Sequence, residues 1–140
     1  MIGKLIGIDH GLKRVGVAVS DALGISAREL ALIEVETDAA TYTELKRLAA
    51  EQNAVAFVVG MPHNEGNTEQ AEAVQAWVTG LKATTPLPVV IWDEQLSSAD
   101  AKQLAKQQKR PPRQPIDDLA ARVILQSYIN ALADGLAPPP

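Results

Sequence analysis

Two short apolar runs in the middle of the chain constrain its fold more than any other feature. They are residues 55–60 (VAFVVG) and 89–92 (VVIW), each bounded by polar or turn-forming residues. Runs this short and this rich in β-branched residues are typical of strands buried on both faces. A helical pattern over residues 68–82 separates them, and strand–helix–strand connections are parallel and right-handed. The sequence therefore predicts parallel strands covered by helices.

The N-terminal part follows a different pattern. Three strand-like stretches come in succession, at residues 4–9, 14–20 and 30–35, with turns around Gly11 and Gly24. Close succession with tight turns predicts an antiparallel meander. Further helices are predicted at residues 40–52, 98–108 and 116–133. The fold class expected is α/β, a mixed sheet with helices packed on it.

Length and composition indicate one domain without thiol chemistry. The 140 residues are 46% hydrophobic and include no cysteine. A chain of this size forms one core, which we assign to residues 1–133, and the proline-rich residues 134–140 are expected to be a flexible tail. Any metal must be held by oxygen or by a histidine. The first residues are too short for a signal peptide and no apolar run reaches membrane-spanning length, so we expect a cytoplasmic protein without membrane contact.

Acidic residues stand where two predicted strands end. Asp9 ends the first strand, where a buried carboxylate is costly unless it binds a cation or hydrogen-bond donors, and Gly11 beyond it allows close backbone approach. Asp93 and Glu94 follow the run at 89–92. Ligands of α/β sheets bind outside the carboxyl ends of the strands. The alternative for Asp9 is a turn residue that caps the hairpin, and alternation puts Asp93 and Glu94 on opposite faces without saying which points inward.

The last predicted helix begins with two more acids. At about 100° per residue, Asp117 shares a face with an apolar stripe, whereas Asp118 lies four residues before Arg122 and suits a surface ion pair. The stripe consists of Ala120, Ala121, Ile124 and Tyr128. Either aspartate could instead be the helix N-cap after Pro115. A carboxylate on the core-facing side is nevertheless a candidate ligand.

Separated carboxylates at element ends suit Mg²⁺ or Mn²⁺, which prefer oxygen ligands. Two such ions about 3.5–4 Å apart can activate a water and stabilise the leaving oxygen of a phosphodiester. The loop at residues 60–67 (GMPHNEGN) precedes a helix whose free amides could receive a phosphate, or it is only a connection. His10 and His63 could orient a water or a phosphate, but histidines in loops are commonly surface residues, and neither is assigned to the catalytic set.

Four segments closely resemble the YqgF/RuvX family of ribonuclease H-like proteins, described both as pre-16S rRNA nucleases and as Holliday-junction-resolvase-like proteins. They occur in the family's order and spacing over almost the whole chain. The segments are residues 7–21 (GIDHGLKRVGVAVSD), 58–71 (VVGMPHNEGNTEQA), 92–98 (WDEQLSS) and 116–128 (IDDLAARVILQSY). The resemblance implies a ribonuclease H-like fold with a five-stranded mixed sheet, its first three strands antiparallel, and a nuclease site that uses Mg²⁺ or Mn²⁺.

The family's catalytic and metal-binding acids fall on Asp9, Glu94 and Asp117, and Asp118 is an additional acid that could replace Asp117 as a ligand. Two positions depart from the family pattern. His10 stands where relatives usually have an aromatic residue, and Gln95 replaces an arginine. Loss of that positive charge could weaken contact with a substrate phosphate. Lys13 or Arg14 could compensate.

The resemblance leaves several functions open. The first is hydrolysis of phosphodiesters in structured nucleic acid, with processing of the 5′ end of pre-16S rRNA as the family role in ribosome biogenesis. The second is cleavage of branched DNA by a Holliday junction resolvase, which must make paired cuts and should therefore be a homodimer. A non-catalytic nucleic-acid-binding module is a third. The glycine turn after Asp9 also resembles the phosphate-binding turn of actin-like sugar kinases, but those need two such domains to enclose ATP.

The positive charge of this acidic protein is concentrated in one segment. The net charge is −4, yet residues 102–113 carry five basic residues and no acid, leaving −9 for the rest. The segment could be a solvated face, or it could bind phosphates. Its members are Lys102, Lys106, Lys109, Arg110 and Arg113.

We expect that neutralising Lys109, Arg110 and Arg113 together weakens nucleic-acid binding about equally for different sequences and flattens its salt dependence, because phosphate contacts carry no sequence information. Affinity measured by fluorescence anisotropy across a salt series tests this. An unchanged affinity and salt slope would return the segment to a solvated face.

Overall fold

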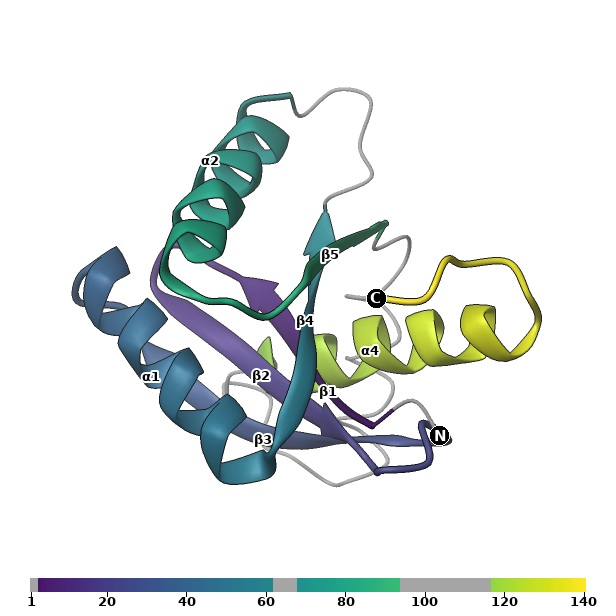
Figure 1. Ribbon diagram of the computed structural model, residues 1–140. Helices are drawn as coiled ribbons and strands as arrows, with labels where there is room; N and C mark the ends of the chain where they lie inside the picture. The colour runs from purple at the N-terminus through teal and green to yellow at the C-terminus, as the bar shows by residue number, and fades with distance from the viewer. Residues whose placement is uncertain (1–2, 62–67, 94–116) are drawn as a thin grey trace, which may run out of the picture.

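Five strands form one mixed sheet in the computed structural model, which describes residues 3–61, 68–93 and 117–140 (Figure 1). The spatial order is β3-β2-β1-β4-β5. β2 pairs antiparallel with β1 and β3, and β4 pairs parallel with β1 and β5. The strands are β1 Lys4–His10, β2 Arg14–Ser20, β3 Ala27–Glu34, β4 Ala54–Met61 and β5 Val89–Asp93. The predicted α/β class, with an antiparallel start and parallel continuation, is confirmed.

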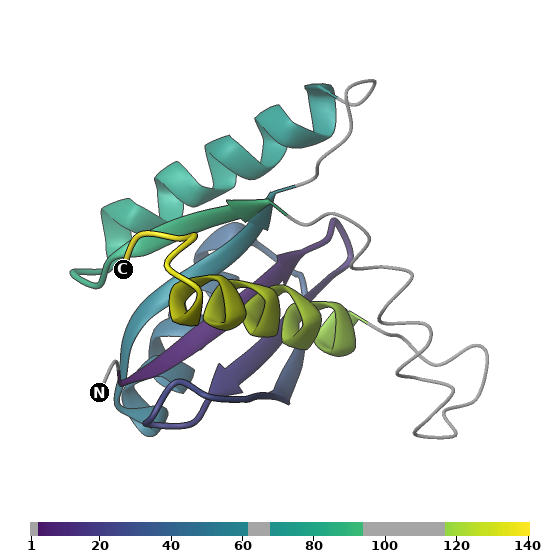
Figure 2. The ribbon, with the colours of Figure 1, turned by 90° about the vertical axis from the view of Figure 1, so that its right-hand side faces the viewer.

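Helices cover both faces of the sheet. The helices among the described residues are α1 Asp38–Gln52, α2 Thr68–Thr84 and α4 Asp117–Ala133. α1 and α2 lie on one face, and α4 crosses the other (Figures 1 and 2). Strand alternation separates the two cores: Ile6 and Ile8 pack with α1 and α2, whereas Leu5 packs with α4. The helix predicted at residues 98–108 lies outside the described residues.

A glycine lets α4 lie directly against the central strand. Gly7 of β1 faces α4, and a Cβ built on it would stand 2.6 Å from Cβ of Leu125 and 3.1 Å from the Ala121 carbonyl oxygen. Both neighbours belong to the helix framework and cannot rotate away. Any other residue at position 7 would therefore push the helix off the sheet.

Two elements begin two or more residues before the start expected from the sequence. β3 begins at Ala27, three residues before the predicted start at 30. Two of the three added residues, Arg28 and Glu29, are charged and lack an apolar pattern, but the backbone N–H of the third, Ala27, donates to Oε1 of Gln126 in α4 at 2.8 Å. α1 begins at Asp38 rather than at 40, because the Thr37 hydroxyl accepts a hydrogen bond from the Ala40 N–H and caps the helix.

The segment after α4 folds back along the molecule. The Tyr128 hydroxyl donates to the Pro138 carbonyl at 2.6 Å, the Leu136 N–H donates to the Ala131 carbonyl at 2.8 Å, and Ala137 packs on the α4 side of the sheet. These contacts attach the expected tail to the helix that precedes it. No helix among the described residues is long and apolar enough to cross a membrane.

Replacing Gly7 by alanine should destabilise the protein by about 3 kcal/mol, because the new methyl group overlaps the framework of α4. The matched control is Gly135→Ala, whose new Cβ would meet no atom within 4 Å. Its only penalty is the positive φ of 73°, which should lower the free energy of unfolding by about 1 kcal/mol. Urea unfolding of both variants measures the difference. Equal losses would contradict the close approach of α4 to β1.

Candidate active site

Asp9 lies near the carboxyl end of β1, on the face that α4 covers. Leu5 and Gly7 face α4, and Asp9 is the next residue with the same orientation. Its partner across the β1–β2 ladder is Gly16, which brings no side chain to crowd the carboxylate. The side chain is half-buried. The structure thus gives Asp9 the strand-end position expected from the sequence.

Contacts between α4 and β3 fix the direction of the helix. Gln126 bonds to Ala27 at the start of β3, and one turn earlier Arg122 pairs with Glu29, with Nη1 3.0 Å from Oε2. The N-terminal part of α4 therefore lies beside the C-terminal part of β3, near the edge of the sheet where β1 ends. The first turn of α4 therefore lies at that edge. Figure 2 shows α4 crossing this face of the sheet.

The first turn of α4 carries the two aspartates. The predicted apolar stripe that follows is buried throughout, with Ala120, Ala121, Ile124 and Tyr128 at most 5% exposed. Asp118 is half-buried, and its Oδ1 accepts a hydrogen bond from the Leu119 N–H at 3.0 Å. Asp117 is the first residue of α4, but its side chain lies outside the described residues. Its role as a ligand stays a prediction.

The third acid follows β5. Because β1, β4 and β5 are parallel, β5 ends at the same edge as β1. The ring of Trp92 stacks edge-on against Tyr128 of α4 with centroids 5.4 Å apart, so Trp92 faces α4 and the exposed Asp93 faces the other way. Asp93 therefore does not share the face of Asp9. Glu94, the next residue, lies outside the described residues.

Within the described part of the chain, no three Asp, Glu or His side chains lie close enough to hold a metal ion. Two of the three predicted ligands, Glu94 and the Asp117 side chain, lie outside that part. The convergence of the three acids is therefore a prediction that rests on Asp9 and on the course of α4 and β5.

His10 belongs to the opposite face. Its ring stacks on Trp77 of α2 with centroids 4.7 Å apart, and Trp77 in turn contacts Tyr42, whose hydroxyl donates to the Trp77 carbonyl at 2.7 Å. Burial lowers the pKa of His10, and the nearby carboxylate of Asp38 opposes this shift. A neutral imidazole packed on an indole suits a structural role. The structure thus separates His10 from the face that carries Asp9.

Of the predicted nucleic-acid-binding residues, two are described. Lys13 is exposed in the turn between β1 and β2, and its carbonyl accepts a hydrogen bond from the Val35 N–H at 2.9 Å. Arg14 opens β2 opposite Glu34 of β3. Both lie at the edge where β1 ends. Seven further residues singled out in the sequence lie outside the described residues: Lys102, Lys106, Lys109, Arg110, Arg113, Gln95 and His63.

A hollow of about 390 Å³ lies beside this edge, on the side of α2. Residues 10–12 form one wall, and Glu69, Gln70, Ala73 and Val74 of α2 form the other. Leu12, at the tip of the β1–β2 turn, is 87% exposed. Leu12, Glu69 and Gln70 were not expected from the sequence to form a site. The one sequence feature that could have indicated it is an apolar residue, Leu12, in the turn between Gly11 and Lys13.

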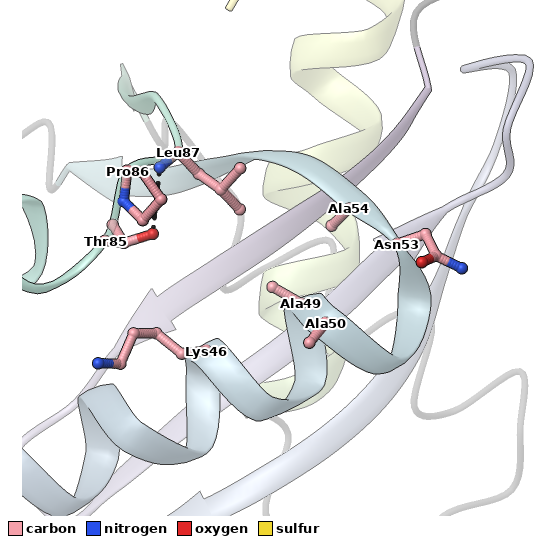
Figure 3. A pocket seen from close by; sticks show the side chains of 8 residues that line it. All are labelled: Lys46, Ala49, Ala50, Asn53, Ala54, Thr85, Pro86 and Leu87. Atoms are coloured by element: carbon pink, nitrogen blue, oxygen red, sulfur yellow. Dashed lines mark hydrogen bonds between the residues drawn. The ribbon is translucent and has the colours of Figure 1, made fainter.

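A second hollow, of about 430 Å³, lies at the other end of the sheet, where β4 begins. Figure 3 shows its lining from the end of α1 and from the turn before β5, including Lys46, Asn53 and Leu87. Thr85 accepts a hydrogen bond there from the Leu87 N–H at 3.2 Å. This second hollow lies at the opposite end of the sheet from Asp9.

The sequence model of the RuvX family, described as Holliday junction resolvase, matches residues 3–131. The chain belongs to this family. A relative from Geobacillus kaustophilus (strain HTA426), named "Putative pre-16S rRNA nuclease", is 40% identical over 136 residues, which cover 91% of this chain and 98% of the relative. A relative of the same name from Listeria monocytogenes serovar 1/2a (strain ATCC BAA-679 / EGD-e) is 37% identical over 134 residues, covering 91% and 97%.

Solved structures support the fold of the family member described here. RuvC of T. thermophilus, solved in complex with a Holliday junction substrate, is similar with a TM-score of 0.66 at 14% identity, covering 99% of both chains. The Fowlpox virus resolvase, solved with Holliday junction DNA, gives 0.56 at 11% identity over 92% of this chain and 98% of the other. The ribonuclease H-like fold expected from the resemblance is confirmed.

The stacking of His10 on Trp77 predicts a pH-dependent contribution to stability. Because burial lowers the folded-state pKa of His10 below its ordinary value of 6.5, the contact is fully stabilising above about pH 6.5 and loses strength as pH falls toward the folded pKa. The carboxylates facing this side are Asp38 of α1 and Glu69 of α2.

The free energy of unfolding should therefore exceed that of His10→Gln, which cannot titrate, by a margin that shrinks from about pH 7.5 to about pH 5.5. Urea titrations of both proteins at each pH measure the margin. A margin that is constant or that grows on acidification would contradict the neutral, buried state of His10.

Proposed function

We propose that this protein is a metal-dependent nuclease that hydrolyses phosphodiesters in structured RNA and processes the 5′ end of pre-16S rRNA, acting in the cytoplasm. The observation that carries the proposal is that Asp9 and the first turn of α4 lie at the same edge and on the same face of the sheet. The choice of pre-rRNA rests on the name of the relatives at about 40% identity.

We assign the catalytic and metal-binding roles to Asp9, Glu94 and Asp117, with Asp118 as the substitute for Asp117. Asp9 has a rigid position, because its strand is central in the sheet and is held by ladders on both sides. The first turn of α4 is held relative to Asp9 by the contact of Gly7 with Ala121 and Leu125. A carboxylate that is already held in place binds a metal ion without a further loss of conformational entropy.

The donor chemistry fits Mg²⁺ or Mn²⁺. The proposed ligands are all carboxylates, and the chain has no cysteine that would favour a softer metal. When bound, such ions supply Lewis-acid polarisation of the phosphodiester and lower the pKa of water. No side chain is assigned as nucleophile, since Ser97 and Ser98 have no histidine near them in sequence.

Lys13 is suited to hold the substrate backbone at this edge. Lys13 is exposed in the turn between β1 and β2, four residues after Asp9. Arg14 and the basic residues Lys109, Arg110 and Arg113 are assigned the same role, as contacts that position the phosphate chain without reading its sequence.

A Holliday junction resolvase is the second candidate, favoured by the description of the family model and by the likeness of the fold to RuvC. A resolvase makes two symmetric cuts and needs two active sites, so it should be a homodimer in solution. Sedimentation of the full chain, followed by cleavage assays on a four-way DNA junction and on a pre-rRNA fragment, separates the two functions.

Cleavage of a pre-16S rRNA fragment should disappear in EDTA and return with Mn²⁺ or Mg²⁺. Asp9→Asn should lower the rate at least about 10²-fold while the variant still folds and binds RNA, because it removes a metal ligand without changing the shape of the side chain. Gel assays of the cleaved ends measure both effects. Circular dichroism and anisotropy check folding and binding.

The matched control is Asp93→Asn, a strand-end acid of β5 on the other face of the sheet, which should retain near-normal cleavage. Cleavage that persists in excess chelator, or at a near-normal rate in Asp9→Asn, would overturn the proposed mechanism. Cleavage of the junction alone would transfer the function to the resolvase.

A further inference from the structure

The hollow between the β1–β2 turn and α2 has the make-up of a site for a flat, partly polar ligand. Its volume is about 390 Å³, within the range of small-ligand sites. The His10 ring, Leu12, Ala73 and Val74 give it apolar walls, and Glu69 and Gln70 give it hydrogen-bonding groups on one side. Sites of this kind bind a planar ring on the apolar walls and orient it by the polar groups.

The apolar tip of the turn is unusual in its setting. Leu12 is 87% exposed, and it stands between Gly11 and the exposed Lys13. An exposed leucine alone needs no explanation. Here it borders a hollow, beside a cation, three residues after the proposed catalytic Asp9. Nucleic-acid-binding proteins place apolar side chains beside phosphate-binding cations to contact bases that have left the stack.

The charge of the hollow decides which part of a nucleotide it accepts. The Glu69 carboxylate would repel a phosphate, so an anion is disfavoured inside. The same carboxylate accepts a hydrogen bond from an exocyclic amino group, as glutamate does from cytosine N4. Lys13 lies outside the hollow and is placed to bind the phosphate on either side of the bound nucleotide.

We infer that this hollow, at residues 10–12 and the first two turns of α2, receives one unpaired nucleobase next to the cleaved phosphodiester. The base lies against Leu12 and the His10 edge of the hollow and donates its amino group to Glu69. The inference rests on the proposed function, since it takes the substrate strand to pass Asp9. It makes the β1–β2 turn a determinant of which nucleotide flanks the cut: cytosine, with its amino group, binds better than uracil, which presents a carbonyl at that position.

Binding to an RNA hairpin with a short unpaired 5′ flank tests the inference. The protein is the full chain carrying Asp9→Asn, with wild-type protein in EDTA as a second preparation. One abasic residue is moved through the flank, and affinity is measured by anisotropy. At one position the abasic residue should weaken binding about tenfold, as the loss of a stacked base does.

Filling the hollow should remove this effect. Ala73→Leu adds bulk at an exposed helix position, so it should fold normally, and the abasic residue should then cost nothing further. The matched control is Ala76→Leu, the same change at an exposed position of α2 outside the hollow, which should keep the tenfold effect. A tenfold effect that survives Ala73→Leu, or no abasic effect at any position, would overturn the inference.

Base preference gives a second readout. At the sensitive position cytosine should bind better than uracil, and Glu69→Gln should reduce that difference, because an amide can also donate to the uracil carbonyl. The control is Glu72→Gln, three residues further along α2 and outside the hollow, which should leave the preference for cytosine unchanged. A preference that Glu69→Gln leaves intact would overturn the role of Glu69.

The two proposals fail separately. A wild-type protein that cleaves with Mg²⁺ but shows no abasic effect would retain the proposed function and overturn the base site. A protein that shows the abasic effect and its loss in Ala73→Leu, yet cleaves no RNA, would support the base site and overturn the proposed function.

Discussion

The close approach of α4 to the central strand is the contact on which the proposed active site depends. Gly7 has no Cβ, and one placed there would stand 2.6 Å from Cβ of Leu125. The helix can therefore lie on β1 itself, and the residues on either side of the contact are brought together. Asp9 follows Gly7 by two strand residues, about 7 Å, and the first turn of α4 precedes Ala121 by about 6 Å. Those two short steps lead to the same edge.

Polar contacts with β3 fix the orientation that the Gly7 contact leaves free. Arg122 pairs with Glu29, and Gln126 bonds to the backbone on both sides of Ser26 through its amide group. The Arg122–Glu29 pair is partly shielded, with side chains 33% and 22% exposed, so it is screened less than an open surface pair. The Gly7 contact alone would let α4 rotate over the sheet. The additional contacts with β3 fix the rotation, so that the first turn of α4 lies at the edge where β1 ends.

Strand alternation divides the chemistry at that edge between two faces. Asp9 faces α4, whereas His10 faces α2 and stacks on Trp77. A nucleic-acid strand passing over this edge would meet Asp9 on one face and the hollow bordered by Glu69 on the other. The two faces suit different parts of a nucleotide, since metal-binding carboxylates act on the phosphate and apolar walls accept a base.

The sequence by itself determined the class of fold, the order of its elements and the identity of the family. Those follow from local periodicity and from motifs that are contiguous in the chain, such as the alternation in residues 14–20 and the apolar stripe from Ala120 to Tyr128. The tertiary structure decided the start of β3, because Gln126 supplies a bond from a helix about a hundred residues away. It also decided that Asp93 points away from the face of Asp9, that His10 stacks on Trp77, and that Leu12 and Glu69 border one hollow. These relations join residues far apart in sequence, and only packing fixes which faces meet.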